Sequence, residues 1–204
     1  MVQENPRITA VWRLPSLIGT LSSTAQAALP AQLQLWYLQQ QLIESLRLNK
    51  SYQSYITLNQ TSLQEIEWWI SNLHLTNGKS IVLPSAKIVI QPDASKKGWG
   101  AHCLGQSVGG QWTSQESSQH INLLELKAVH LALLTFSKVR NMTAVHLQMD
   151  NMTALSYLVR MGGTNSKELT SIAKDIWDFL LKKQMKITAE YLPEVLHTQT
   201  DIAS

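Results

Sequence analysis

Four carboxylates in the chain could carry out chemistry together, and they are Asp93, Glu125, Asp150 and Asp201. Each follows a predicted strand or lies on a predicted helix, so one mixed sheet could bring them into a common crevice. Like charges about 4 Å apart repel by roughly 4 kcal/mol at an effective dielectric of about 20, so the group requires cations. Oxygen ligands select Mg²⁺ or Mn²⁺, and two such ions about 3.5–4 Å apart can activate water against a phosphodiester. The set therefore predicts metal-dependent phosphodiester hydrolysis.

Each carboxylate also has an ordinary structural interpretation. Asp93 stands in Asp-Ala-Ser, which suits a turn, and Asp150 precedes Asn151, where a helix N-cap would contribute about 1 kcal/mol. Glu125 lies on an apolar helix face with no Lys or Arg four residues away. It either reaches solvent at the edge of that face or is buried, in which case a cation is implied. Asp201 taken alone suits a tail residue.

The elements that would position these carboxylates belong to the second half of the chain. Strands are predicted at 87–90, 98–103, 109–112, 144–149 and 185–192, and helices at 121–139, 152–161 and 166–183. The order of three strands, helix, strand, helices and strand predicts an α/β fold with a mixed sheet covered by helices.

The first half of the chain carries few titratable groups and no recognisable chemistry. Apolar residues recur at helical spacing over 31–48, and a second helix is signalled by Ser62 with Glu65 three residues later, a capping-box pattern. Asn77-Gly78 is expected to end that helix. With no strand alternation, residues 1–85 are predicted to be helical.

Composition excludes several classes of protein. Of 204 residues, 44% are hydrophobic and 15% charged, and the net charge of +3 permits a polyanionic partner without requiring one. A single cysteine excludes a disulfide framework and a multi-cysteine zinc site. The N-terminal residues lack a signal-peptide pattern, and no apolar run approaches the roughly 18 residues of a membrane span. A soluble intracellular protein, cytoplasmic or nuclear and not secreted, with no membrane partner is expected.

Several other catalytic and binding motifs are absent from the sequence. The chain has no His-x-x-x-His pair on a helix, no glycine-rich phosphate loop with Lys-Ser/Thr and no Gly-x-Ser-x-Gly. The tryptophans at 68, 69, 99 and 112 could stack on bases, but a place in the core is the favoured interpretation.

A resemblance to a known family appears in the spacing of four motifs. They are Asp93-Ala-Ser-x-x-Gly-Trp-Gly-Ala-His102, Gln111-Trp-x-x-x-Glu116-Ser-Ser-x-His-Ile-Asn-x-x-Glu-Leu126, Asp150-Asn-x-Thr-Ala154 and Gly162-Gly-Thr164. Over about residues 86–204 they resemble the ribonuclease H domain of DIRS-like retroelements, which also encode a tyrosine recombinase. Upstream, Leu14-Pro-Ser-Leu-Ile-Gly19 and Glu67-Trp-Trp-x-x-Asn72-Leu are similar to the thumb and connection that end the reverse transcriptase.

The resemblance implies a fold and a division of the chain. Residues 86–204 would form a ribonuclease H-like mixed five-stranded sheet flanked by helices and truncated at its C-terminus. Residues 1–85 would be the helical thumb/connection-like segment before it. The implied activity is divalent-metal-dependent endonucleolytic hydrolysis of the RNA strand of RNA–DNA hybrids, within a retroelement reverse transcriptase polyprotein. The polymerase domain and the tyrosine recombinase of the parent element would be its partners.

The resemblance also assigns roles to individual residues. The four carboxylates become the catalytic groups and the ligands of two Mg²⁺ or Mn²⁺ ions. Asp93 and Asp150 would bind metal, Glu125 would bind metal or orient water, and Asp201 would be a more mobile fourth ligand.

Nucleic-acid contacts are implied for Asn122, Asn151 and Ser95. For Asn122, which matches a position that touches the minor groove of the hybrid, a helix N-cap is the alternative. The 2′-hydroxyls would distinguish RNA from DNA.

Three departures from the family pattern support an alternative. Pro92 removes a backbone donor next to Asp93, His197 stands where the family usually has Asn, and only three residues follow Asp201. A stub that short cannot form the helical hydrogen bonds that would fix the carboxylate, so weak activity is expected. The alternative is a catalytically weak or inactive nucleic-acid-binding or connection module. A DNA-cutting nuclease or transposase of the same fold is disfavoured by the run from Asn122 to Glu125. The chain has no polymerase Asp-Asp motif.

Overall fold

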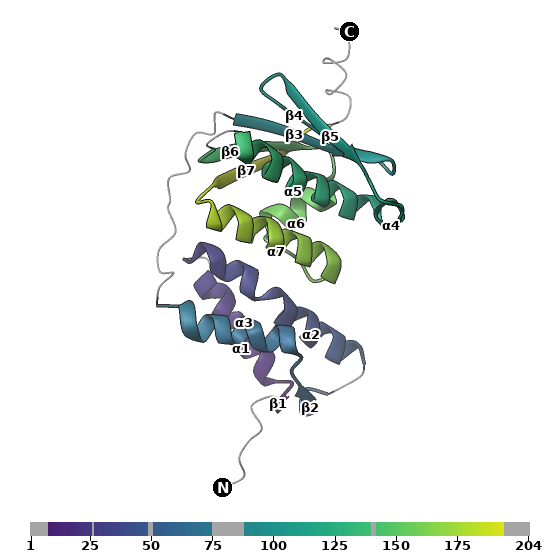
Figure 1. Ribbon diagram of the computed structural model, residues 1–204. Coiled ribbons are helices and arrows are strands. Elements are labelled where there is room, and N and C mark those ends of the chain that lie inside the picture. The colour runs from purple at the N-terminus through teal and green to yellow at the C-terminus, as the bar shows by residue number, and fades with distance from the viewer. Residues whose placement is uncertain (1–7, 26, 49–50, 75–87, 140–141, 194–204) are drawn as a thin grey trace. The chain divides into compact units, whose positions relative to one another are not determined.

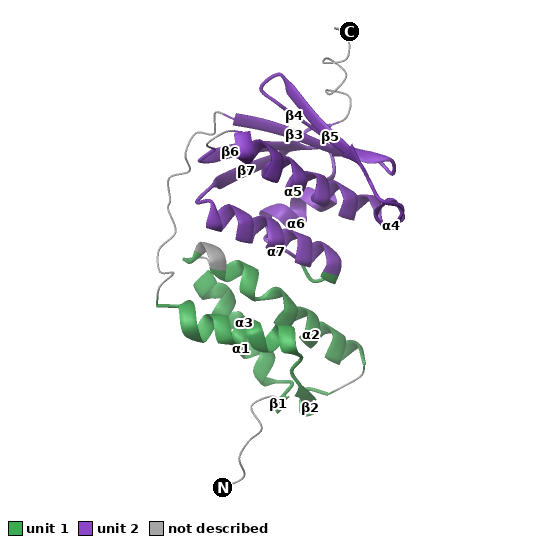
Figure 2. Ribbon diagram, in the orientation of Figure 1, with its two compact units in different colours: residues 1–81, 163–167 green, residues 82–162, 168–204 purple. Residues whose placement is uncertain are grey.

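The computed structural model describes residues 8–25, 27–48, 51–74, 88–139 and 142–193, which belong to two compact units (Figures 1 and 2). Unit 1 comprises Met1–Ile81 with Gly163–Lys167, and unit 2 comprises Val82–Gly162 with Glu168–Ser204. The boundary predicted between residues 85 and 86 falls within residues 75–87, outside the described ranges. No helix in the described ranges is long and apolar enough to cross a bilayer.

Unit 1 is mainly helical. Its elements in chain order are β1 (Ile8–Ala10), α1 (Arg13–Ala25), the 3₁₀ helix η1 (Leu29–Gln34), α2 (Trp36–Arg47), β2 (Tyr55–Thr57) and α3 (Gln60–Asn72). The antiparallel pairing of β1 with β2 corrects the prediction that this segment has no strands. Two strands of three residues are too short for an alternating pattern to show in the sequence. The helix predicted over 31–48 is divided into η1 and α2 at Leu35.

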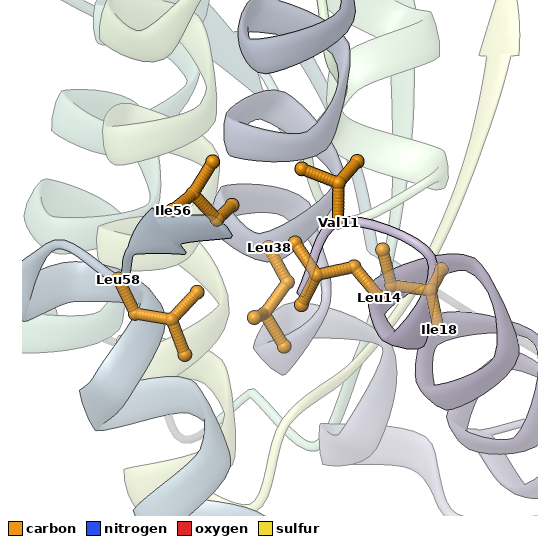
Figure 3. Close-up of a cluster of buried hydrophobic side chains, with 6 residues drawn as sticks. All are labelled: Val11, Leu14, Ile18, Leu38, Ile56 and Leu58. Atoms are coloured by element: carbon orange, nitrogen blue, oxygen red, sulfur yellow. The ribbon is translucent and has the colours of Figure 1, made fainter. Parts of the chain in front are cut away.

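Apolar side chains from the strands and helices of unit 1 form its core. Figure 3 shows one cluster, which consists of Val11, Leu14, Ile18, Leu38, Ile56 and Leu58. A second cluster contains Trp69, whose ring is buried while its Nε1 donates to the Gln34 carbonyl at 2.7 Å. Burial with a satisfied N–H is the usual arrangement of a core tryptophan. The core interpretation of Trp69 is confirmed, and stacking on bases is excluded for it.

The start of α3 differs from the predicted capping box. The N-cap is Asn59, whose Oδ1 accepts from the Ser62 backbone N–H at 2.8 Å. Glu65 caps a different helix, because its carboxylate accepts from the backbone N–H groups of Tyr37 and Leu38 at 3.1 and 2.9 Å, in the first turn of α2. The pattern of Ser62 and Glu65 was therefore wrong as a capping box, since Ser62 lies inside the helix. The helix also ends at Asn72, before the predicted stop at Asn77-Gly78.

Unit 2 is built on a five-stranded mixed sheet with the order β5-β4-β3-β6-β7. The strands are β3 (Ile88–Ala94), β4 (Gly98–Cys103), β5 (Gln106–Gln111), β6 (Ala144–Met149) and β7 (Lys186–Tyr191). β3, β4 and β5 pair antiparallel, whereas β6 runs parallel to β3 and to β7. All five predicted strands are present, with β3 reaching four residues beyond its predicted end.

Helices cover one side of this sheet, as Figure 1 shows. They are α4 (Ser114–Ser117), α5 (Ile121–Val139), α6 (Met152–Val159) and α7 (Lys167–Lys182). α5 packs on β3 and β4, α6 contacts α5 and β7, and α7 is joined to α6 by the bond from Trp177 Nε1 to the Leu158 carbonyl. The expected mixed five-stranded sheet flanked by helices, after a mainly helical segment, is confirmed.

The two faces of the sheet differ in chemistry because side chains alternate along each strand. On β6, every second residue is buried and apolar, and the half-buried His146 and Gln148 between them point to the opposite face. On β3, Ile90 is buried on the helix side, whereas Gln91 and Asp93 alternate with it onto the opposite face. That opposite side of β3, β6 and β7 is called the polar face below.

Gly98 of β4 and Gly109 of β5 stand where the two backbones approach closely. A Cβ at Gly98 would lie 2.4 Å from the Gly110 carbonyl oxygen, and one at Gly109 would lie 2.7 Å from the Trp99 carbonyl oxygen. Both distances are shorter than the roughly 3 Å that real Cβ atoms keep from other atoms, so side chains are excluded at these two positions of the β4–β5 pair.

Candidate metal centre

Three of the four predicted carboxylates meet at one end of the sheet of unit 2. Asp93 lies near the end of β3, Asp150 follows β6 directly, and Glu125 projects from the second turn of α5. One carboxylate oxygen from each residue lies within 4.8 Å of the others. The fold thus joins a strand, a strand end and a helix that are far apart in the sequence.

Asp93 belongs to the strand and is not a turn residue. It pairs with Gly100 of β4, and the turn begins only after Ala94, where the Ser95 N–H donates to the Gly98 carbonyl at 2.9 Å. The turn interpretation of Asp93 is therefore wrong by two residues. As a strand residue on the polar face, Asp93 has a side chain whose direction the sheet fixes.

The N-cap interpretation of Asp150 is also wrong. The N-cap of α6 is Asn151, whose Oδ1 accepts from the Ala154 N–H at 2.9 Å. Because Asn151 satisfies the helix terminus, the Asp150 carboxylate can face Asp93 and Glu125.

Glu125 is buried, with 7% of its surface exposed, so the solvent-edge interpretation does not hold. Burial, together with the nearby charges of Asp150 and Asp93, raises the pKa of Glu125 to about 8, against a lowering by the Ala94 backbone N–H. The cause is that desolvation and like charges both disfavour an ionised carboxylate.

The donor set of this centre fits a hard divalent cation. All three ligand atoms are carboxylate oxygens, which Mg²⁺ and Mn²⁺ prefer. The charges acting on Glu125 are negative, and a bound cation would offset them.

Two of the predicted nucleic-acid-binding residues bond to each other. Asn151 Nδ2 donates to Asn122 Oδ1 at 3.0 Å, which links the start of α6 to the start of α5. Asn122 is not the N-cap of α5, because its own N–H donates to the His120 ring Nδ1 at 3.2 Å from within the helix. The N-cap alternative for Asn122 is thus wrong, and its contact with nucleic acid stays a prediction.

Ser95, the third predicted contact, organises the β3–β4 turn. Its Oγ accepts from the N–H groups of Lys97 and Gly98 at 3.2 and 3.3 Å, and its hydroxyl is exposed beside Asp93. These bonds explain a serine in the turn without a ligand. Binding of nucleic acid by Ser95 stays a prediction.

The fourth carboxylate and one departure lie outside the described residues. Asp201 and His197 both fall in residues 194–204, so their predicted roles stay predictions. Pro92 is buried in β3 opposite Ala101, and β3 stays paired with β4 on both sides of it.

A short helix beside the centre was missed in the sequence. Thr113 is the N-cap of α4 and forms a capping box with Glu116, a spacing that could have been found. The segment is tied to the β3–β4 turn because Trp112 Nε1 donates to the Ser95 carbonyl at 2.9 Å and Lys96 Nζ donates to the Gln119 carbonyl. The ring N–H of Trp112 is therefore used in a structural hydrogen bond at the rim of the centre.

Comparisons with known proteins yield matches among solved structures. No protein-family model matches the chain, and no curated protein does. LC11-RNase H1 in complex with an RNA/DNA hybrid is 13% identical with a TM-score of 0.48, over 55% of this chain and 90% of that one. RNase H1 from the halophilic archaeon Halobacterium salinarum NRC-1 is 16% identical with a TM-score of 0.45, over 54% of this chain and 89% of that one.

A third match extends over both units. The foamy viral protease-reverse transcriptase in complex with dsDNA is 14% identical with a TM-score of 0.42, over 95% of this chain and 40% of that one. These likenesses concern the path of the backbone, and none of them assigns an activity to this chain.

Proposed function

We propose that unit 2 hydrolyses the RNA strand of RNA–DNA hybrids in a reaction that depends on Mg²⁺ or Mn²⁺. The observation that carries the proposal is the meeting of Asp93, Glu125 and Asp150 within 4.8 Å, with Glu125 buried. Without a ligand, such a cluster of like charges only destabilises the fold. A structural role does not account for it, whereas a cation-binding role does.

The residues of the chain have distinct tasks in this proposal. Asp93, near the end of β3, and Asp150, directly after β6, face the centre and would bind the cations, with Asp201 as a fourth ligand. Glu125, buried at the back of the centre, would bind a cation or orient the attacking water. A pair of bound divalent cations supplies an activated water and stabilisation of the leaving 3′ oxygen.

Recognition of the hybrid would come from polar groups around the centre. Asn122 and Asn151 already form a linked amide pair beside Asp150, and Ser95 presents an exposed hydroxyl beside Asp93. Lys97 is exposed on the same turn and could meet a phosphate. Contacts to 2′-hydroxyls would select the RNA strand.

The wider setting follows from the sequence motifs. Unit 1 would be the thumb and connection that precede the ribonuclease H domain in a DIRS-like reverse transcriptase polyprotein. The polymerase domain and the tyrosine recombinase of that element would be partners. The cytoplasm or the nucleus, where such hybrids form, would be the place of action.

A cleavage assay on an end-labelled RNA–DNA hybrid tests the proposal. The chain should cut the RNA strand in Mg²⁺ or Mn²⁺ and not in EDTA, and duplex DNA of the same sequence should stay intact. Asp150→Asn should abolish cutting, while Asp175→Asn, a change at an exposed position on α7, should leave it intact. Equal cutting by the wild type and Asp150→Asn would refute the proposal.

The alternative, a weak or inactive nucleic-acid-binding module, makes a different prediction. It requires hybrid binding whose affinity falls as salt rises, without cleavage in either metal. Filter binding on the same labelled hybrid, run beside the cleavage assay, separates the two functions.

A further inference from the structure

The sheet of unit 2 divides just before the carboxylate centre. In the described residues, the parallel backbone pairing of β3 with β6 ends at Ile90 and Leu147. Beyond that point, β3 continues to pair with β4 as far as Ala94, while β6 continues with β7 as far as Met149. Two separately paired halves of the sheet therefore lead to the centre.

The two aspartates of the centre lie on different halves. Asp93 belongs to the β3–β4 half and Asp150 to the β6–β7 half. Continued in register, the strands would place these residues opposite each other, three positions past the last backbone pair. The spacing between them therefore depends on whatever joins the halves beyond Ile90 and Leu147.

A relay of side-chain hydrogen bonds crosses this division on the polar face. Gln91 Nε2 donates to Gln148 Oε1 at 2.8 Å, and Gln148 Nε2 donates to Glu190 Oε1 of β7 at 2.9 Å. The same Glu190 oxygen contacts His146 Nε2 at 3.0 Å. Each glutamine lies two residues before an aspartate: Gln91 shares the face of Asp93 because side chains alternate along β3, and Gln148 lies near the end of β6, which Asp150 directly follows.

The direction of the relay is fixed by its end. An ionised carboxylate only accepts hydrogen bonds, so Glu190 must receive the amide N–H of Gln148. The amide oxygen of Gln148 is then turned toward β3, where it can accept only from the amide nitrogen of Gln91. The charged Glu190 of β7 thus determines a single arrangement of both glutamines.

From this placement we infer that Gln91 and Gln148 are positioning residues, which with Glu190 set the distance between the metal-binding carboxylates Asp93 and Asp150. The inference rests on the proposed metal-dependent function and extends it to residues that do not touch the cation. Partners behind metal ligands commonly change metal affinity by about 10–100-fold when they are removed.

Binding of Mn²⁺ to the metal-free chain, titrated by the loss of the free-ion electron paramagnetic resonance signal, measures this effect without catalysis. Gln91→Leu and Gln148→Leu keep a side chain of comparable bulk and remove the hydrogen bonds. Each should raise the Kd for Mn²⁺ by about 10–100-fold. Gln111→Leu on the exposed strand β5 is the matched control and should leave the Kd unchanged.

An exchange of partners separates positioning from a general effect on folding. Gln148→Glu alone places a second carboxylate opposite that of Glu190, and the repulsion should weaken Mn²⁺ binding. Adding Glu190→Gln restores one carboxylate and one amide, in reversed order and with the original net charge. Both bonds can form again, because the new carboxylate accepts from Gln91 and from the new amide. The double variant should therefore bind Mn²⁺ almost as tightly as the wild type.

The outcomes distinguish this inference from the function on which it rests. If the wild type binds Mn²⁺ and Asp150→Asn does not, the metal centre stands. In that case, an unchanged Kd in Gln91→Leu and Gln148→Leu, or a double variant no better than Gln148→Glu, overturns the positioning role. If the wild type and Asp150→Asn bind Mn²⁺ equally, the proposed metal-dependent function has itself failed.

Discussion

Replacing Glu125 by Gln should make the metal-free protein more stable at neutral pH. Glutamine keeps the shape of the side chain and an oxygen that can accept from the Ala94 N–H, but it removes the charge. Since Glu125 is 7% exposed and faces Asp93 and Asp150, the wild type must either bury an ionised carboxylate among like charges or protonate it. The variant does neither.

The size of the gain follows from the pKa of Glu125. With an ordinary value of 4.5 raised to about 8, the folded protein keeps the side chain protonated at pH 7. Protonating a carboxyl of ordinary pKa at pH 7 costs about 3.4 kcal/mol, at 1.36 kcal/mol for each pH unit. Repulsion between two charges 4.8 Å apart gives a similar figure, about 3.5 kcal/mol at a dielectric of 20. We expect a gain of about 2–3 kcal/mol, or roughly 4–12 °C in Tm.

The sign of the pH dependence follows from proton binding. Because the pKa of Glu125 is raised in the folded state, the folded wild type binds more protons than the unfolded chain between pH 4.5 and about 8. Its stability is complete below pH 4.5 and falls as the pH rises through that window. The advantage of Glu125→Gln should therefore be absent near pH 4.5 and largest near pH 8.

Urea unfolding in EDTA at pH 4.5, 7 and 8 measures this difference. Glu116→Gln is a matched control of opposite sign, because the bonds from Thr113 lower the pKa of that half-buried carboxyl. The stability that Glu116 contributes is present above its ordinary pKa and lost as the pH falls, so its replacement should bring no gain at pH 7. If Glu125→Gln is no more stable than the wild type at pH 7, or its gain is the same at pH 4.5, the reasoning about this centre is wrong.

Three further predictions concern other residues. Mn²⁺ at a hundred times its Kd should add about 2.7 kcal/mol to the free energy of unfolding of the wild type and so raise its Tm, but it should not raise the Tm of Asp150→Asn. Equal shifts of Tm in the two proteins would contradict binding at this centre. Glu65→Ala should destabilise unit 1 by about 2–4 kcal/mol in urea unfolding, because it leaves the N–H groups of Tyr37 and Leu38 buried without their acceptor, whereas Glu65→Gln should cost less. Burial lowers the pKa of His130, against an opposing effect of Asp175, so the folded protein binds fewer protons than the unfolded chain and loses stability as the pH falls below 6.5. The free energy of unfolding of His130→Gln, measured at pH 7.5 and 5.5, should not show this loss. An equal change with pH in the wild type and in His130→Gln would count against the prediction.

The fold of unit 2 could be predicted because its signals are local. Each strand carries a β-branched or glycine-punctuated run, and α5 is an unbroken apolar helix whose predicted bounds, 121 and 139, match the structure. In unit 1 the signals were weaker. Strands of three residues have no visible period, and Glu65 could not be assigned to α2 because the residues it caps are far away in the sequence.

The carboxylates could be found from the sequence, but their geometry could not. Glu125 stood out because no cation was placed to pair with it on its helix. Whether Asp93 ended a strand or began a turn depended on how far β3 continues beside β4, which is a property of the sheet. Gln91 and Gln148 gave no signal at all, because a glutamine in a strand has no distinctive chemistry until its neighbour across the sheet is known.

The carboxylate centre and the glutamine relay have opposite effects on the same part of the sheet. Repulsion between Asp93 and Asp150 tends to separate the β3–β4 half from the β6–β7 half at the point where backbone pairing has ended. The bond from Gln91 to Gln148 joins the halves next to that repulsion, and the bond from Asn151 to Asn122 joins the Asp150 segment to the helix that carries Glu125. Neutral amides suit this task, since they add no charge to a centre that is already too negative. A cation that binds there then meets ligands already close together, so less of its binding free energy is lost in assembling them.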